Sequence, residues 1–284
     1  MGAAPTKETT IATKDGLSLH AELWQPDGPA TNGVVVLVHG FSAHCGNFRH
    51  VAQHLATAGI ATWLFDSRGH GRSEGRRGYV GRFSDYSDDL DLMITAARAE
   101  WPGRPLALVG HSQGGTVALD YLTSTAGRGP ISALVLAAPW LALKLKVPAV
   151  KLVLSRVMGG IWPTLTMGNE IDPGQVSRNP EAIAGWEKDK LIHHVATPRW
   201  FNEVRAAQAR IVASPEKLQV PTLLLAAGDD RLVSADAALA YAMAVGPTID
   251  VRTYAGLYHE IFLEPERQVV LADIVSWLAP RFRA

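Results

Sequence analysis

The sequence has little cysteine, no excess of either charge and no long hydrophobic run. Cys45 is the only cysteine among 284 residues, so a disulfide within the chain is excluded. Lysine plus arginine and aspartate plus glutamate both number 27. This balance gives no electrostatic reason to expect nucleic acid as a partner. The longest uncharged apolar run, Gly129–Leu143, contains two prolines and is too short to cross a bilayer.

From the first ten residues we expect no secretory signal. Residues 1–10 are polar and have no apolar segment of the kind found in secretory signals. One cysteine is compatible with a reducing compartment, and we expect a cytoplasmic protein, at most peripheral to a membrane. What the chain does have is apolar content: 47% hydrophobic and 19% charged residues allow a sizeable core.

Apolar, β-branched runs alternate with amphipathic helical segments at both ends of the sequence. Strands are predicted at 10–12, 17–24, 33–38, 60–65, 106–109, 131–138, 220–226 and 249–254. Helices are predicted at 47–58, 85–99, from 116 onward and at 264–278. The pattern predicts an α/β fold whose sheet is mostly parallel and covered by helices on both faces. The first two strands, joined at Asp15-Gly16, are expected to form an antiparallel edge.

The alternation stops between Pro139 and about Ser214. This insert is rich in aromatic and amphipathic stretches, shows no clear strand, and predicts a helical cap over the carboxyl edge of the sheet. The resulting organisation is a core in two parts, residues 1–138 and 215–284, separated by the cap at 139–214.

A serine between two glycines follows the strand predicted at 106–109. Gly110-His111-Ser112-Gln113-Gly114 matches the nucleophile elbow G-x-S-x-G, in which a tight strand-to-helix turn exposes the serine hydroxyl. A Cβ at either glycine would crowd the neighbouring strand and helix. Because a glycine-rich turn with an incidental serine gives the same pentapeptide, the interpretation needs an acid, a base and oxyanion donors elsewhere in the chain.

The acid and the base are predicted in two later loops. Two aspartates follow the strand at 220–226; we choose Asp230, which has the acid's place in the D-x-x-V pattern that often follows this strand in hydrolases, and keep Asp229 as the alternative. His259, between the last strand and the last helix, is the predicted base. Taken alone, either feature also fits an ordinary surface loop.

The oxyanion donors are expected to be backbone N–H groups. One is that of Gln113, directly after the serine, and the other that of Phe41, in the loop after the strand at 33–38. His193 and His194 are adjacent and have no cysteine or carboxylate cluster beside them, so we predict no metal site.

Five segments together resemble the monoacylglycerol lipase and lysophospholipase branch of the α/β-hydrolase superfamily. They are HGFSAH at 39–44, FDSRGHGRSEGRRGYV at 65–80, GHSQGG at 110–115, AGDDRLV at 227–233 and YAGLYHEIFLE at 254–264. The resemblance covers nearly the whole chain and is weakest in the insert. It implies an α/β-hydrolase fold, Ser112 as nucleophile, a cap that forms the acyl tunnel, and loop-ordering roles for Asp66, Arg68 and His70. Ser42-Ala43 replaces a Gly-Glu pair of the better-known lipases, which weakens any transfer of their headgroup contacts.

The predicted function is therefore hydrolysis of lipid esters, as a monoacylglycerol lipase or a lysophospholipase, through an acyl-enzyme and without metal or organic cofactor. Trp140, Trp162, Trp186 and Trp200 are the predicted substrate-binding residues. Residues 140–162 are apolar with scattered cations; we favour packing of their apolar face on the core, and the alternative is docking on a membrane surface.

Two other functions remain open on the sequence. A proline-type serine aminopeptidase would need an acidic group for the substrate amine, for which Glu170, Glu181 and Glu187 are candidates. A non-enzymatic binding protein of this fold should have lost a triad member, and Ser112, Asp230 and His259 are all present.

Overall fold

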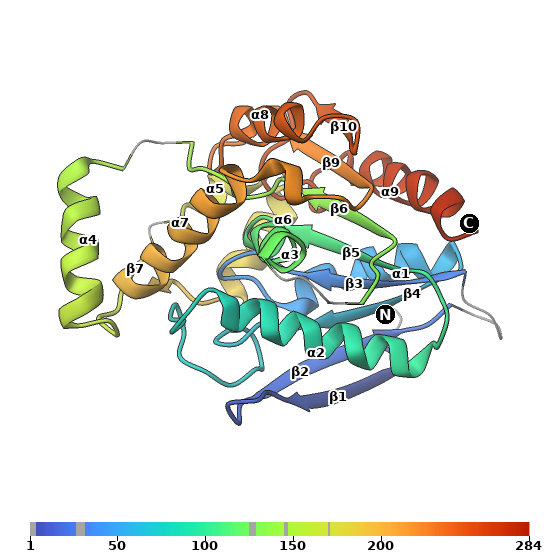
Figure 1. Ribbon diagram of the computed structural model, residues 1–284, viewed down its shortest axis with the longest axis horizontal. Helices are drawn as coiled ribbons and strands as arrows, with labels where there is room; N and C mark the ends of the chain where they lie inside the picture. The colour runs from blue at the N-terminus through green and yellow to red at the C-terminus, as the bar shows by residue number, and fades with distance from the viewer. Residues whose placement is uncertain (1–3, 27–31, 125–128, 145–146, 170, 284) are drawn as a thin grey trace.

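An eight-stranded sheet with helices on both faces forms the centre of the structure, a computed structural model that describes residues 4–26, 32–124, 129–144, 147–169 and 171–283 (Figure 1). Its strand order is β1-β2-β4-β3-β5-β6-β9-β10. The pairs β1–β2 and β2–β4 are antiparallel and the others are parallel. The predicted fold class and the antiparallel leading edge are confirmed.

The strands of this sheet are β1 (Lys7–Ala12), β2 (Ser18–Trp24), β3 (Gly33–Val38), β4 (Ile60–Phe65), β5 (Leu106–His111), β6 (Ala133–Ala137), β9 (Thr222–Ala227) and β10 (Ile249–Tyr254). The core helices are α1 (Arg49–Thr57), α2 (Ser84–Glu100), α3 (Gln113–Ser124), α8 (Ala235–Val245) and α9 (Arg267–Arg281). Helix α8 has no counterpart among the predicted helices, because its alanine-rich sequence carries little amphipathic contrast.

The central strands are apolar on both sides because both faces of the sheet are covered. In β3, Val34 and Val36 belong to the apolar cluster on the face covered by α2, α3 and α8, whereas Val35 and Leu37 belong to the cluster on the face covered by α1 and α9. A continuous β-branched run suits this doubly buried environment. Because β3, β5, β9 and β10 run parallel, their carboxyl ends lie along one edge of the sheet, and the loops that follow them meet there.

The insert at 139–214 lies between β6 and β9. Its helices are α4 (Ala149–Ile161), α5 (Pro173–Val176), α6 (Pro180–Lys188) and α7 (Pro198–Val212). The expectation that it holds no strand is wrong, since β7 (Met167–Gly168) pairs with β8 (Val195–Ala196); two residues are too few to produce a periodic pattern. Figure 1 shows α4 at one end of the molecule and α9 near the other. Among the described residues, no helix is long and apolar enough to span a membrane.

Candidate active site

The tight turn between β5 and α3 holds Ser112 in a left-handed backbone conformation. Its φ is 52°, in the left-handed region that costs a non-glycine residue roughly 1–3 kcal/mol. A Cβ on Gly114 would lie 2.1 Å from the carbonyl oxygen of Val38, and one on Gly110 would lie 2.6 Å from the carbonyl oxygen of Gly114. Both positions therefore need glycine, for the steric reason inferred from the sequence.

The side chains of Ser112, His259 and Asp230 form a hydrogen-bonded chain. His259 Nε2 lies 2.9 Å from Ser112 Oγ, and His259 Nδ1 lies 2.8 Å from Asp230 Oδ2. All three residues are buried. Asp229 is exposed, so the structure brings Asp230 rather than its neighbour to the imidazole.

Asp230 is held as an anion that orients the ring. Its other oxygen, Oδ1, accepts hydrogen bonds from the N–H groups of Leu232 and Val233, both at 2.9 Å. Burial raises the pKa of Asp230, but His259 and these N–H groups outweigh burial and leave the pKa below its usual value. An anionic acceptor at Nδ1 fixes the proton on that nitrogen, which leaves the lone pair of Nε2 directed at Ser112.

The same carboxylate makes His259 a stronger base. Burial lowers the pKa of His259, and attraction to Asp230 together with their hydrogen bond raises it by more, so the net pKa lies above the usual value of 6.5. His111 holds the backbone of His259, because its Nε2–H donates to the carbonyl oxygen of His259 at 3.2 Å. The sequence analysis gave His111 no role, because it occupies a position of the elbow motif that any residue can fill.

The two backbone N–H groups predicted as oxyanion donors belong to Phe41 and Gln113. Phe41 follows β3, and a Cβ on Gly40 would lie 3.1 Å from Ser112 Cβ, which shows how closely this loop approaches the elbow. Among the described residues, neither Phe41 N–H nor Gln113 N–H donates a hydrogen bond to another protein group. These are the two donors predicted for the oxyanion, and the structure leaves both available.

The oxyanion loop (residues 39–44) is held by buried polar contacts. His39 Nδ1–H donates to Gly40 O at 2.7 Å and its Nε2 accepts from Ser67 N–H at 2.9 Å. Burial lowers the pKa of His39 to about 4, so the ring is neutral, as its acceptor role demands. Ser42 has a φ of 67° and its Oγ accepts from Asn169 Nδ2 of the insert at 2.8 Å.

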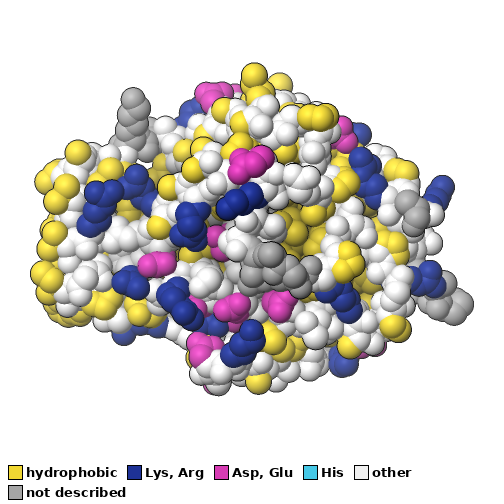
Figure 2. All heavy atoms as spheres, viewed as in Figure 1, with side chains coloured by type: hydrophobic (Ala, Val, Ile, Leu, Met, Phe, Trp, Pro, Cys, Tyr) yellow, Lys and Arg dark blue, Asp and Glu magenta, His cyan; other side chains and the backbone are white. Residues whose placement is uncertain are grey.

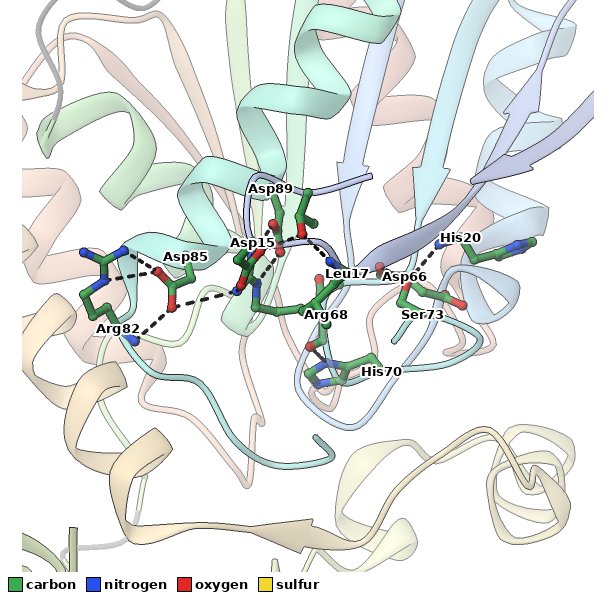
Figure 3. A network of polar contacts seen from close by, with 12 residues as sticks. Asp15, Leu17, His20, Asp66, Arg68, His70, Ser73, Arg82, Asp85 and Asp89 are labelled. Atoms are coloured by element: carbon green, nitrogen blue, oxygen red, sulfur yellow. Dashed lines mark hydrogen bonds and ion pairs between the residues drawn. The ribbon is translucent and has the colours of Figure 1, made fainter. Parts of the chain in front are cut away.

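The loop after β4 is ordered by its own charged residues. Arg68 donates to both oxygens of Asp89, each at 2.6 Å, and to Asp15 (Figure 3). Asp66 accepts the N–H groups of Cys45 and Arg72, both at 2.7 Å. These contacts join the loop to α2, to the leading hairpin and to the residues after the oxyanion loop, and they use the charges of Asp66 and Arg68 for structure.

Comparisons with known proteins agree with this geometry. The model of the family described as "Serine aminopeptidase, S33" matches residues 29–266. The monoacylglycerol lipase of Mycolicibacterium smegmatis is 32% identical over 98% of this chain and 99% of its own. The chain belongs to the monoacylglycerol lipase branch of the α/β-hydrolases. It is a carboxylic ester hydrolase.

Other members of this family are similar over most of the chain. Phospholipase YtpA of Bacillus subtilis is 31% identical over 87% of this chain and 94% of its own. The crystal structure of the monoacylglycerol lipase from Paleococcus ferrophilus superposes with a TM-score of 0.83 at 29% identity, covering 93% of this chain and 99% of that one.

A cluster of ligand-type side chains lies beyond the oxyanion loop. His20, Glu22 and Cys45 have donor atoms within 4.8 Å of one another, the one such group among the described residues. Glu22 is already paired with Arg49, whose Nε lies 2.9 Å from Oε2. Burial and the nearby carboxylates raise the pKa of the Cys45 thiol far above its usual range, so it stays protonated. A guanidinium on the carboxylate and a protonated thiol do not suit a metal ion.

The four tryptophans predicted to bind substrate do not lie together. Trp140 and Trp200 pack against each other, with ring centroids 5.6 Å apart. The backbone N–H of Trp140 donates to the carbonyl oxygen of Ser112. Trp186 packs in a small separate cluster with Val176 and Ile192. Trp162, at the end of α4, is 57% exposed and lines no described cavity, so a pocket made by all four is wrong.

The sequence analysis favoured packing of the apolar face of α4 on the core, and the structure does not show this packing. Only Ser155 and Gly159 of α4 are buried. Five of its large apolar residues are exposed, at 49–77%: Val150, Val153, Leu154, Val157 and Ile161. Leu152 and Met158 are half-buried. Ser155 and Asn202 of α7 exchange two hydrogen bonds, so α4 contacts the protein through a narrow face and most of its apolar surface points to solvent. Figure 2 shows hydrophobic side chains along this edge of the molecule.

Proposed function

We propose that this chain hydrolyses monoacylglycerols and related single-chain lipid esters through an acyl-enzyme on Ser112. The observation that carries the proposal is the hydrogen-bonded chain from Ser112 Oγ through His259 to Asp230, with the free N–H groups of Phe41 and Gln113 beside it. This arrangement supplies a nucleophile, a base, an orienting acid and oxyanion donors.

In the acylation step, Ser112 Oγ attacks the ester carbonyl carbon while His259 Nε2 takes the hydroxyl proton. The carbonyl oxygen becomes an oxyanion that accepts hydrogen bonds from the N–H groups of Phe41 and Gln113. As the tetrahedral intermediate collapses, the bond to the alkoxy oxygen breaks and His259 returns its proton to the leaving alcohol. A water molecule then repeats the sequence on the acyl-enzyme, releasing the fatty acid and restoring Ser112.

A largely apolar cavity between the segment after β6 and helices α4 and α7 supports a lipid acyl group as the substrate portion on the insert side. The cavity has a volume of about 510 Å³ and is lined by residues that include Trp140, Leu152, Phe201 and Val212. Trp140, one of its lining residues, also donates its backbone N–H to the carbonyl oxygen of Ser112. Residues 139–214 then act as a cap whose underside receives the chain, which agrees with the monoacylglycerol lipase relatives.

The exposed apolar face of α4 supports docking of the cap on a lipid surface. Monoacylglycerols partition into membranes and droplets, and an amphipathic helix with an unpartnered apolar face binds such surfaces. Lys151 and Arg156 are exposed on the same helix, and cations close to a membrane surface are attracted to anionic headgroups.

The aminopeptidase alternative has no support from the described insert. Glu181 and Glu187 are exposed on α6 rather than turned toward the serine, and Glu170 lies outside the described residues. A substrate amine held near Ser112 would need a carboxylate that faces it.

The test is a substrate panel: aryl esters of increasing acyl length, monoacylglycerol, lysophosphatidylcholine and an aminoacyl anilide. We expect the highest kcat/KM on monoacylglycerol, lower values on lysophospholipid, and no turnover of the anilide. Turnover of the anilide without ester hydrolysis would refute the proposal. Preference for lysophosphatidylcholine would keep the mechanism and change the headgroup.

A further inference from the structure

We propose that Trp200 of α7 is a positioning residue that holds both halves of the oxyanion hole. The proposal rests on the function given above, in which Phe41 and Gln113 supply the two N–H donors. The sequence analysis placed Trp200 in the substrate pocket; its contacts instead join it to these two donor residues.

One contact is with the residue after the nucleophile. The indole Nε1–H of Trp200 donates to Gln113 Oε1 at 3.1 Å. Both residues are buried, with 3% and 2% of their surface exposed, so the hydrogen bond forms without competition from water. The side chain of Gln113 is thereby fixed, and with it the first residue of α3, whose backbone N–H faces the site.

The other contact is with the oxyanion loop. The rings of Phe41 and Trp200 stack with their centroids 3.7 Å apart and their planes at 21°. Stacked aromatic pairs contribute beyond their buried area. The Phe41 N–H itself donates to no described group, and its peptide plane is held through Gly40 O by His39 Nδ1–H at 2.7 Å. The stack with Trp200, with edge contacts to His193 and His70, adds a restraint from the side chain of Phe41 on where that N–H points.

Trp200 can restrain its neighbours because its own helix is anchored to the core. Thr197, the N-cap of α7, donates through its N–H and its Oγ to the carbonyl oxygen of Gly78, at 2.9 and 2.8 Å. Its Oγ also accepts the N–H of Trp200 at 3.2 Å. Two further contacts, Arg199 Nε to Gly81 O and Phe83 N–H to Glu203 Oε2, fix the same turn.

A single side chain from the insert therefore contacts both donor residues. Oxyanion stabilisation depends on donors placed within a few tenths of an ångström of where charge develops. The expected effect of releasing Trp200 is therefore on kcat, because the donors act on the transition state, with little effect on KM.

The experiment compares the full-length wild type with Trp200→Phe and Trp200→Leu on p-nitrophenyl butyrate. Trp200→Phe keeps a ring for Phe41 and loses the N–H; we expect kcat to fall about ten-fold, a fraction of the 10²–10³ seen when a donor is removed, with KM changed less than two-fold. Trp200→Leu loses both contacts and should be slower than Trp200→Phe. Gln113→Met removes the same hydrogen bond from the other end, and adding Trp200→Phe to it should cost little more.

A second readout is inhibition by an alkyl trifluoromethyl ketone. Ser112 Oγ adds to the ketone carbon, its proton passes to His259, and the resulting oxyanion occupies the hole. We expect its inhibition constant to weaken by the factor lost in kcat. The matched control is Trp277→Phe in α9, which also removes an indole N–H···O bond, a partly buried one to Asp250 at 2.7 Å, and should leave kcat unchanged.

Two results would overturn the proposal. One is an unchanged kcat in Trp200→Phe, whatever its melting temperature; the other is a loss confined to KM, which would make Trp200 a pocket residue as the sequence suggested. Neither would touch the proposed function, which fails separately if the wild type hydrolyses no ester and its Ser112 does not react with a fluorophosphonate.

Discussion

The carboxyl edge of the sheet buries polar side chains, whereas α4, the outer helix of the insert, exposes apolar ones. At the sheet edge, Ser112, Asp230 and His259 are buried and bonded to one another. On α4, Val150 and Ile161 are exposed by 73% and 77% while Ser155 faces the protein. The sheet edge holds its polar side chains in a fixed, buried geometry, whereas α4 leaves apolar side chains exposed to solvent.

The largest expected difference between the two regions comes from removing triad groups. Ser112→Ala or His259→Ala should lower kcat by about 10⁴-fold or more, because the nucleophile or its base is lost. Asp230→Asn should cost about 10⁴-fold, since the ring loses its tautomer and its stabilising charge. Steady-state kinetics on p-nitrophenyl butyrate measure all three.

Asp229→Asn is the matched control for the acid. Asp229 is exposed and does not contact the imidazole, so this variant should retain wild-type kcat/KM. Full activity of Asp230→Asn together with a large loss in Asp229→Asn would reverse the assignment of the acid.

Protonation of His259 should change kcat/KM with pH, by less than the loss of a triad side chain does. Asp230 raises the pKa of His259 above 6.5, and only the neutral ring can accept the proton of Ser112. We therefore expect kcat/KM to fall about ten-fold per pH unit below that raised pKa, with the limb above pH 6.5. The residual activity of Asp230→Asn should show the limb at lower pH, because the carboxylate that raised the pKa is gone. An identical limb in both proteins would contradict this account.

Changes on α4 should have the smallest effect, and only with a lipid surface present. Combined substitution of Val150, Leu154 and Ile161 by serine removes apolar area from the exposed face. We expect several-fold weaker binding to vesicles containing anionic lipid, measured by co-sedimentation, and unchanged kcat on soluble p-nitrophenyl butyrate.

A control for α4 replaces exposed apolar residues elsewhere. Met243→Ser with Val269→Ser changes side chains that are 83% and 56% exposed on α8 and α9. Vesicle binding that depends equally on both sets of residues would show that α4 is not a specific docking face.

Sequence reasoning succeeded where local pattern and backbone geometry coincide. The apolar runs that became β3, β4 and β9 have the composition of doubly buried strands, and the glycines around Ser112 have a steric cause that the elbow itself creates. It failed for α4, because an amphipathic pattern states that one face is apolar but not which face meets the protein.

The site shows the same division in finer detail. Short patterns placed Ser112, Asp230 and His259 in three separate loops, and the structure brings the three side chains into hydrogen-bond contact. The contacts of His111 and Trp200 could not be predicted, since each involves a partner distant in the chain: His111 binds the carbonyl of His259, and Trp200 contacts Phe41 and Gln113.

The sequence by itself determined the alternation of strands and helices, the elbow and the order of the reacting side chains, because these follow from short-range sterics and from the two-residue and 3.6-residue periods. Only the tertiary structure decided which face of α4 is exposed, what His111 and Trp200 contact, and that the four tryptophans do not share one pocket. Those choices depend on distances between segments that are far apart in the chain, and no local pattern encodes such a distance.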